Sequence, residues 1–96
     1  MIVSFRDGGT EDIFEGRESR SARRVLPISL HRIAGEKLDW LNAASSLKSL
    51  NLPGLRLEAL RGKRKGLHSI RINDQYRVCF RWTEKGAEDV EIVDYH

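Results

Sequence analysis

Residues 69–82 read SIRINDQYRVCFRW and decide the fold, because apolar and polar residues alternate on both sides of a short polar break. Alternation with a period of two is typical of half-buried β-strands. A three-residue turn at the break places Ile70 opposite Val78 and Arg71 opposite Arg77. A two-residue turn would mix apolar and polar residues along the ladder, so we predict the three-residue turn and an antiparallel pair.

This register gives the two faces of the hairpin different characters. The face expected to form the core carries Ile70, Ile72, Tyr76, Val78, Phe80 and Trp82. The face expected to point outward carries Ser69, Arg71, Arg77, Cys79 and Arg81. Directly opposed like charges destabilise a strand pair by a few tenths to about 1 kcal/mol, so the two central arginines should have compensating partners.

A third strand at residues 90–93 follows a turn around Gly86 and extends the sheet into an antiparallel meander. If the pattern continues, Trp82 pairs with Val90, and Tyr95 arrives opposite Arg77. The longer connecting loop leaves a shift of two residues open. On the other side of the hairpin, a strand over residues 56–60 follows the turn Asn-Leu-Pro-Gly at residues 51–54.

The N-terminal half predicts a short strand at residues 2–5 and two helices. Thr10 is the expected cap of a short first helix that Gly16 closes. A longer helix over residues 28–44 presents an apolar stripe of Leu30, Ile33, Ala34, Leu38 and Leu41. The charged run from residue 17 to residue 24 lacks periodicity and indicates a loop or a frayed first turn.

Length and composition favour one domain over residues 1–96, of class α+β, with an antiparallel-rich sheet and two N-terminal helices packed on one face. No apolar stretch approaches the roughly 18 residues of a membrane span, so we expect a cytoplasmic protein without a membrane partner. The single cysteine, Cys79, excludes an internal disulfide and a zinc ribbon. We predict no cofactor and no metal site.

Positive charge is concentrated in the middle of the chain. Residues 56–81 hold eight basic residues against two acidic ones, a net of +6. Residues 82–96 hold one basic residue against five acidic ones, a net of −4. The two outward arginines, the basic loop at residues 63–65 and the terminal tyrosine and histidine together suit metal-free cleavage of RNA. The simpler alternative is a set of solvated arginines and an ordinary chain end.

Three segments of the chain are informative: GLRLEALRG at residues 54–62, GLHSIRINDQYR at residues 66–77 and VDYH at residues 93–96. They resemble the HigB toxins, including the variant called GraT, of the RelE/ParE superfamily. The resemblance implies a RelE-like fold and a toxin of a type II toxin-antitoxin system that cleaves mRNA on the ribosome and so inhibits translation. It also implies a HigA-type helix-turn-helix antitoxin as partner, with operator DNA bound only through that antitoxin.

The resemblance also implies roles for individual residues. Arg77 matches the arginine that stabilises the phosphate, and Asp94, Tyr95 and His96 match the C-terminal residues linked to catalysis. Many HigB toxins have histidine where this chain has Glu58, which leaves two alternatives: Glu58 acts as the base, or the enzyme is slow. The residues expected to bind RNA or its phosphates are Arg56, Arg61, Lys63, Arg64, Lys65 and Arg71.

A rival hypothesis is a toxin that inhibits by binding alone. ParE relatives act on DNA gyrase in this way, and a basic module could also block ribosome assembly or translation. The ending Asp94-Tyr95-His96 argues against the gyrase alternative, whereas the absence of histidine at position 58 keeps weak or absent catalysis open. A supercoiling assay with gyrase separates these alternatives.

Overall fold

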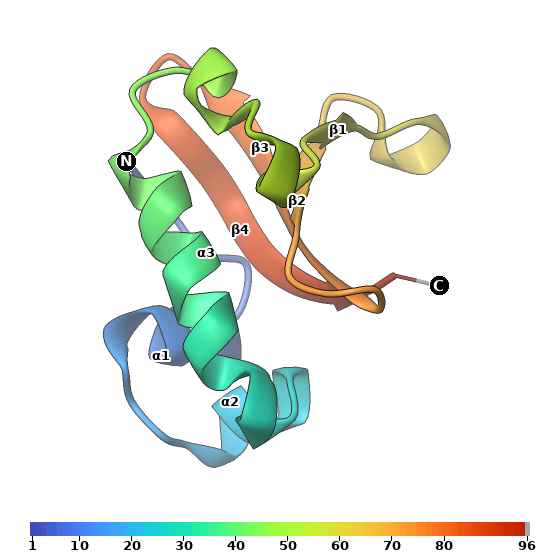
Figure 1. The fold of residues 1–96 in the computed structure, drawn as a ribbon. Helices are drawn as coiled ribbons and strands as arrows, with labels where there is room; N and C mark the ends of the chain where they lie inside the picture. Colours follow the sequence, from blue (N-terminus) through green and yellow to red (C-terminus); the bar gives the residue numbers. More distant parts are fainter. Residues whose placement is uncertain (96) are drawn as a thin grey trace.

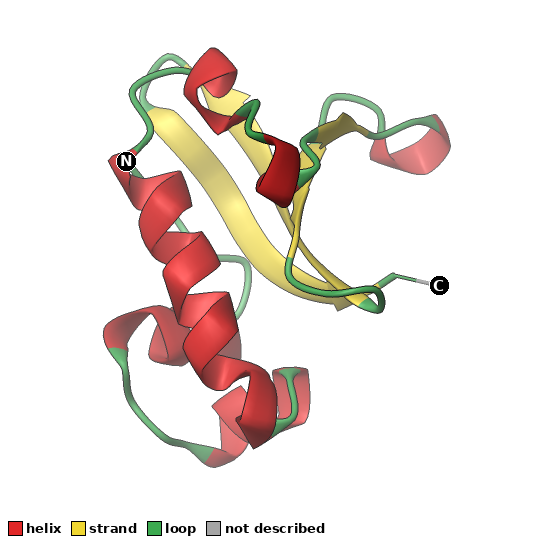
Figure 2. Ribbon diagram, in the orientation of Figure 1, coloured by secondary structure: helices red, strands yellow, loops and turns green. Residues whose placement is uncertain are grey.

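The computed structural model describes residues 1–95, which form an α+β fold with three α-helices and one four-stranded sheet (Figures 1 and 2). Short 3₁₀ helices, labelled η, connect several of these elements. In chain order the elements are α1 Gly8–Glu15, α2 Arg20–Val25, η1 Ile28–Leu30, α3 His31–Ala43, η2 Leu47–Leu50, η3 Pro53–Leu55, β1 Glu58–Ala59, η4 Gly62–Arg64, β2 His68–Arg71, β3 Tyr76–Thr83 and β4 Gly86–Asp94.

The sheet is an antiparallel meander in the order β1-β2-β3-β4. Its central hairpin has the predicted register, with Ile70 opposite Val78 and Arg71 opposite Arg77. The side-chain oxygen of Asn73 accepts hydrogen bonds from two backbone amides of the turn, at 2.9 and 2.8 Å. This local capping of the turn explains why three residues, rather than two, connect the strands.

The predicted register between β3 and β4 was wrong, by two residues toward the end of β4 and by three next to the turn, where Trp82 lies opposite Ala87 and not opposite Val90. Arg77 lies opposite Val93, and not opposite Tyr95. The hairpin turn is tighter than expected, with Thr83 paired to Gly86, and a β-bulge interrupts the ladder next to Asp89, whose φ is 54°. A shift of two preserves the face on which each side chain lies, and the bulge takes up the third residue next to the turn, so the division of the sheet into two faces survives the error.

The predicted N-terminal strand is reduced to two isolated parallel bridges, in which Ile2 pairs with Ala87 and Phe5 with Val90. These bridges still cover the free edge of β4. The strand expected at residues 56–60 is also shorter than predicted and comprises only β1. The preceding segment is the 3₁₀ helix η3, after which Arg56 adopts a left-handed conformation.

The interpretation of residues 17–24 as a loop or frayed turn was wrong, because they contain most of α2. Ser19 caps α2 by accepting a hydrogen bond from the amide of Ala22 at 3.0 Å, and the side chain of Ala22 is buried. Hydrogen bonds from Ser19 and then Arg17 lower the pKa of the Asp12 carboxyl. Asp12 thus fastens the loop between α1 and α2.

The cap of α1 also differs from the prediction, because Asp7 occupies the capping position and accepts a hydrogen bond from the amide of Thr10. Thr10 is instead buried and links the helix to the sheet. Its hydroxyl accepts a hydrogen bond of 3.1 Å from the amide of Ile92 in β4. The closing role of Gly16 is confirmed, with φ at 76°.

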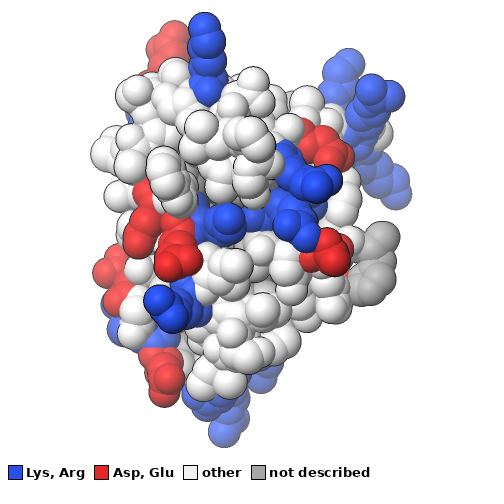
Figure 3. Space-filling view, viewed as in Figure 1, with Lys and Arg blue, Asp and Glu red and all other residues white. Residues whose placement is uncertain are grey.

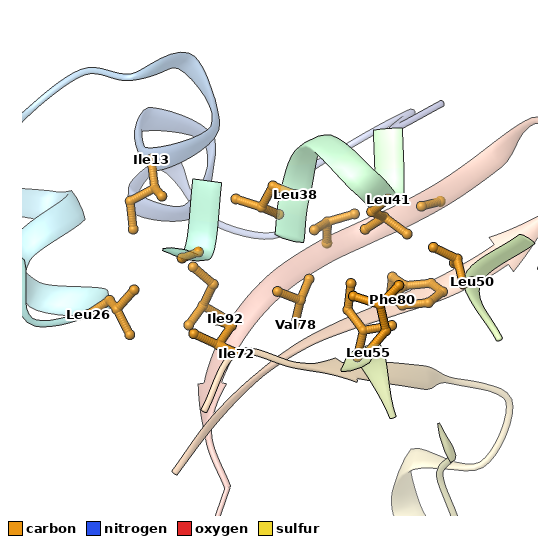
Figure 4. Close-up of a cluster of buried hydrophobic side chains, with 14 of the residues drawn as sticks. Ile13, Leu26, Leu38, Leu41, Leu50, Leu55, Ile72, Val78, Phe80 and Ile92 are labelled. Carbon is orange, nitrogen blue, oxygen red and sulfur yellow. The ribbon is translucent and has the colours of Figure 1, made fainter. Parts of the chain in front are cut away.

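The core lies between α3 and one face of the sheet. The helix prediction for this region is confirmed apart from its first turn, which is η1, but Ile33 of the predicted apolar stripe is 37% exposed. Figure 4 shows side chains of α1 and α3, together with Leu26 at the end of α2, beside those of the sheet. Leu50 and Leu55 extend the cluster beyond the end of α3. Burial of these apolar groups is the main source of stability in a domain of this size.

Within residues 1–95, no helix is long and apolar enough to cross a membrane.

Candidate functional site

The side chain of Arg77 lies on the face of the sheet opposite the core, yet it is only 8% exposed. The predicted face is therefore correct, but the alternative of a solvated arginine is wrong. Instead of extending into water, the guanidinium lies across β2 toward the chain that precedes β1. Burial of an arginine requires polar partners, because a charged group loses its hydration when it leaves water.

Two groups that the sequence analysis did not single out supply those partners. The Nε–H of Arg77 donates to the hydroxyl of Ser69 at 2.7 Å, and Nη2 donates to the carbonyl of Arg56 at 2.6 Å. Ser69 is fully buried in β2. The strand alternation already placed Ser69 on the same face as Arg77, so a search for a partner on that face could have found it.

A pocket of about 460 Å³ adjoins the arginine and is lined by Glu58, Ala59, Leu60, Arg61 and Tyr95. The Glu58 carboxylate lies 3.9 Å from Nη2 of Arg77 and its side chain is 52% exposed. The Tyr95 ring lies under the guanidinium, with 5.6 Å between the ring centroid and Cζ. The Glu58 carboxylate, the Tyr95 phenol and the Arg61 guanidinium thus line one pocket beside the Arg77 guanidinium.

Arg71 is directly opposite Arg77 in the sheet but its side chain has a separate partner. Its guanidinium forms a hydrogen-bonded ion pair with the carboxylate of Asp74 in the turn. The contacts within residues 1–95 therefore do not hold the two guanidinium groups together as one phosphate-binding site. The expected compensation for their like charges is present, since each has an acidic neighbour.

The side chains of Asp94 and Tyr95 lie on opposite faces of the sheet. Tyr95 reaches the pocket because its amide donates to the carbonyl of Gln75 at 2.6 Å, which holds the chain beside the hairpin turn. Asp94 ends β4, and its carboxylate accepts a hydrogen bond from the Gln75 side chain at 3.1 Å. Strand alternation points Asp94 away from the face that Tyr95 lines. His96 lies outside the described residues.

The basic loop forms η4 and is exposed, as predicted for Lys63, Arg64 and Lys65. Figure 3 shows Lys and Arg side chains gathered at the upper right of the molecule, where Figure 1 places this loop. The Arg64 guanidinium also reaches back to the buried sulfur of Cys79, at 3.9 Å. Burial raises the pKa of the Cys79 thiol, so it is not an activated nucleophile.

Within residues 1–95, no three His, Cys, Asp or Glu side chains are grouped so that they could hold a metal ion.

The comparison with known proteins assigns the chain to a family. Residues 3–96 match the family described as the RelE-like toxin of type II toxin-antitoxin system HigB. The chain belongs to the HigB-like toxins. Toxins of type II systems have an antitoxin partner, which is accordingly the partner class of this toxin.

Individual relatives agree with this assignment. The toxin is 36% identical over 85 residues to "Toxin HigB-1" of Vibrio cholerae. The aligned region covers 88% of this chain and 86% of the relative. It is 26% identical to "Endoribonuclease HigB" of Proteus vulgaris over the full length of both proteins. It is also 33% identical over 58 residues to an uncharacterized protein of Haemophilus influenzae, covering 59% of this chain and 57% of the relative.

Proposed function

We propose that this HigB-like toxin is an endoribonuclease that cleaves mRNA on the ribosome and thereby inhibits translation. The observation that carries the proposal is the position of Arg77, a buried cation at the edge of a pocket lined by Glu58 and Tyr95. Membership of the HigB-like family and the full-length relative named as an endoribonuclease support the same reaction.

The proposed reaction is acid–base cleavage within the RNA. A base removes the proton of a 2′-hydroxyl, whose oxygen attacks the adjacent phosphorus, while an acid gives a proton to the departing 5′-oxygen. The products are a 2′,3′-cyclic phosphate and a free 5′-hydroxyl, because the attacking oxygen belongs to the RNA itself and water is not the nucleophile. Arg77 stabilises the additional negative charge that develops on the phosphate oxygens.

Glu58 is the base that the geometry favours. Its carboxylate lines the pocket, is half exposed and so accessible to a substrate, and lies beside the Arg77 guanidinium. Asp94 points to the other face of the sheet, so it would influence the reaction only indirectly, by holding the C-terminal residues that follow it. Tyr95 offers a hydroxyl as the acid beside the same guanidinium, and His96 follows it directly in the chain.

The basic groups around the pocket fit the remainder of the substrate. Arg61 lines the pocket itself, whereas η4 and Arg56 are exposed next to it. We assign the loop residues Lys63, Arg64 and Lys65 to ribosomal RNA, because phosphate contacts from flexible basic side chains position a protein without reading sequence. Arg71, paired with an exposed carboxylate, would contact phosphate by exchanging Asp74 for it.

This function implies the remaining partners. The antitoxin would be a HigA-type helix-turn-helix protein that brings operator DNA to the complex, while the toxin itself contacts the ribosome and mRNA. Translating ribosomes place the toxin in the cytoplasm.

The decisive experiment adds the purified toxin to a reconstituted translation system, with and without ribosomes, and maps new mRNA 5′ ends by primer extension. Cuts should appear only on ribosome-bound message and should be lost with Arg77→Ala. Arg32→Ala is the matched control, because Arg32 is an exposed arginine of α3, on the other side of the sheet. Inhibition of translation without cuts would contradict the proposal and favour a binding inhibitor, and a parallel supercoiling assay would test gyrase.

A further inference from the structure

The guanidinium of Arg77 is anchored along one edge, which leaves its other end for a ligand. Nε donates to the Ser69 hydroxyl, and Nη2 donates to the Arg56 carbonyl at 2.6 Å and to the Ser69 carbonyl at 3.4 Å. Among residues 1–95, Nη1 makes no hydrogen bond. A guanidinium has five N–H donors in a fixed plane, so contacts at Nε and Nη2 determine where the Nη1 donors point.

The Arg56 carbonyl is aimed by an unusual backbone conformation. Arg56 has φ 46° and ψ 54°, a left-handed conformation that is unfavourable for a residue with a side chain. Its neighbours Leu55, which is buried in the core, and Leu57, which is partly buried against it, hold the chain on both sides of the strained residue. The hydrogen bond with the Arg77 cation supplies a compensating interaction, because bonds to charged donors are among the stronger ones in proteins.

We infer that the Ser69 hydroxyl and the Arg56 backbone carbonyl are positioning groups. They hold the Arg77 guanidinium so that its Nη1 donors, next to the Tyr95 ring, point at the scissile phosphate. The inference rests on the proposed endoribonuclease function. Preorganised donors stabilise a transition state better than mobile ones, since no reorientation is needed during the reaction. An arginine on a flexible stem would otherwise swing into solvent or close onto the Glu58 carboxylate, which in the folded chain stays 3.9 Å from Nη2.

The first test removes the Ser69 hydroxyl. Ser69→Ala should slow single-turnover cleavage of ribosome-bound mRNA by roughly 10- to 100-fold, while the affinity for ribosomes, measured by cosedimentation, stays within about threefold. Ser69→Thr retains the hydroxyl and should restore most of the rate. Ser45→Ala, at an exposed serine before η2, is the matched control and should cleave at the wild-type rate.

A double-mutant cycle distinguishes positioning from a general structural effect. Methionine has a side chain of similar length but no N–H donor for the Ser69 hydroxyl, so in an Arg77→Met background Ser69→Ala should change the remaining rate less than about twofold. An equal loss in both backgrounds would overturn the inference, as would wild-type cleavage by Ser69→Ala. Absence of any ribosome-dependent cuts by the wild-type toxin would instead refute the proposed function, and the inference with it.

A second pair of variants tests the carbonyl and serves if Ser69→Ala does not fold. Arg56→Gly and Arg56→Val both remove the side-chain charge, but glycine favours the left-handed conformation and a β-branched residue opposes it. The glycine variant should cleave at least about tenfold faster than the valine variant, with the same affinity for ribosomes. Equal cleavage rates would show that the Arg56 carbonyl does not position Arg77.

Discussion

Arg71 and Arg77 lie directly opposite each other in β2 and β3, yet their guanidinium groups are held by different partners. Arg71 pairs with the exposed carboxylate of Asp74, whereas Arg77 is buried against the hydroxyl of Ser69. One arginine is therefore available for exchange with a ligand, and the other is part of the folded framework. This asymmetry could not be seen in the alternating pattern that placed both on one face.

The asymmetry predicts different losses of stability for the two arginines. Arg77→Ala should lower the free energy of unfolding by about 1–3 kcal/mol, because it leaves buried acceptors of Ser69 and Arg56 without a donor. Arg71→Ala should cost less than about 1 kcal/mol, since its partner Asp74 is 98% exposed. Urea unfolding followed by tryptophan fluorescence measures both, and equal losses would contradict the different burial of the two side chains.

Tyr95 allows the hydroxyl and the ring to be separated. Tyr95→Phe keeps a ring under the Arg77 guanidinium but removes the proton that the proposed acid donates. We expect single-turnover cleavage to fall about 100-fold, with unchanged stability and ribosome affinity. Cleavage at the wild-type rate would leave Tyr95 with a stacking role only, and Tyr95→Ala would then show the contribution of the ring.

Two adjacent glycines at the start of α1 should respond differently to the same substitution. A Cβ at Gly9 would lie 2.5 Å from the Ser21 carbonyl oxygen and would also overlap Val25, whereas a Cβ at Gly8 would meet nothing within 4 Å. Gly9→Ala should therefore destabilise the packing of α1 on α2 by about 1–3 kcal/mol. Gly8→Ala should be neutral or slightly stabilising, and thermal unfolding of the pair provides the comparison.

The buried thiol predicts a loss of stability at high pH. Burial raises the pKa of Cys79 above its ordinary value of 9.0, so between these two pKa values the folded chain keeps a proton that the unfolded chain has released. The free energy of unfolding should fall as pH rises above about 9. Cys79→Ala should show a smaller decrease between pH 8 and pH 10, and parallel decreases would refute a raised pKa.

Much of the fold was predictable because it depends on local periodicity. The central hairpin register follows from the alternation around Asn73, and α3 follows from an apolar stripe with helical spacing. The failures have specific causes. The bulge at Asp89 inserts one residue between the buried Ala87 and Val90, so it changes both the register and the alternation of β4. Helix α2 escaped prediction because a short helix in a charged segment depends on its contacts with α1 more than on its own sequence.

The sequence alone was sufficient to determine the family, the alternating faces of the sheet and the residue types available for RNA cleavage. Only the tertiary structure decided which of them meet. It brings Glu58 and Tyr95 into one pocket beside Arg77, directs Asp94 elsewhere and buries Arg77 against Ser69 and Arg56. The physical reason is that side-chain burial and hydrogen-bond partners depend on long-range packing, which a local pattern of polar and apolar residues does not specify.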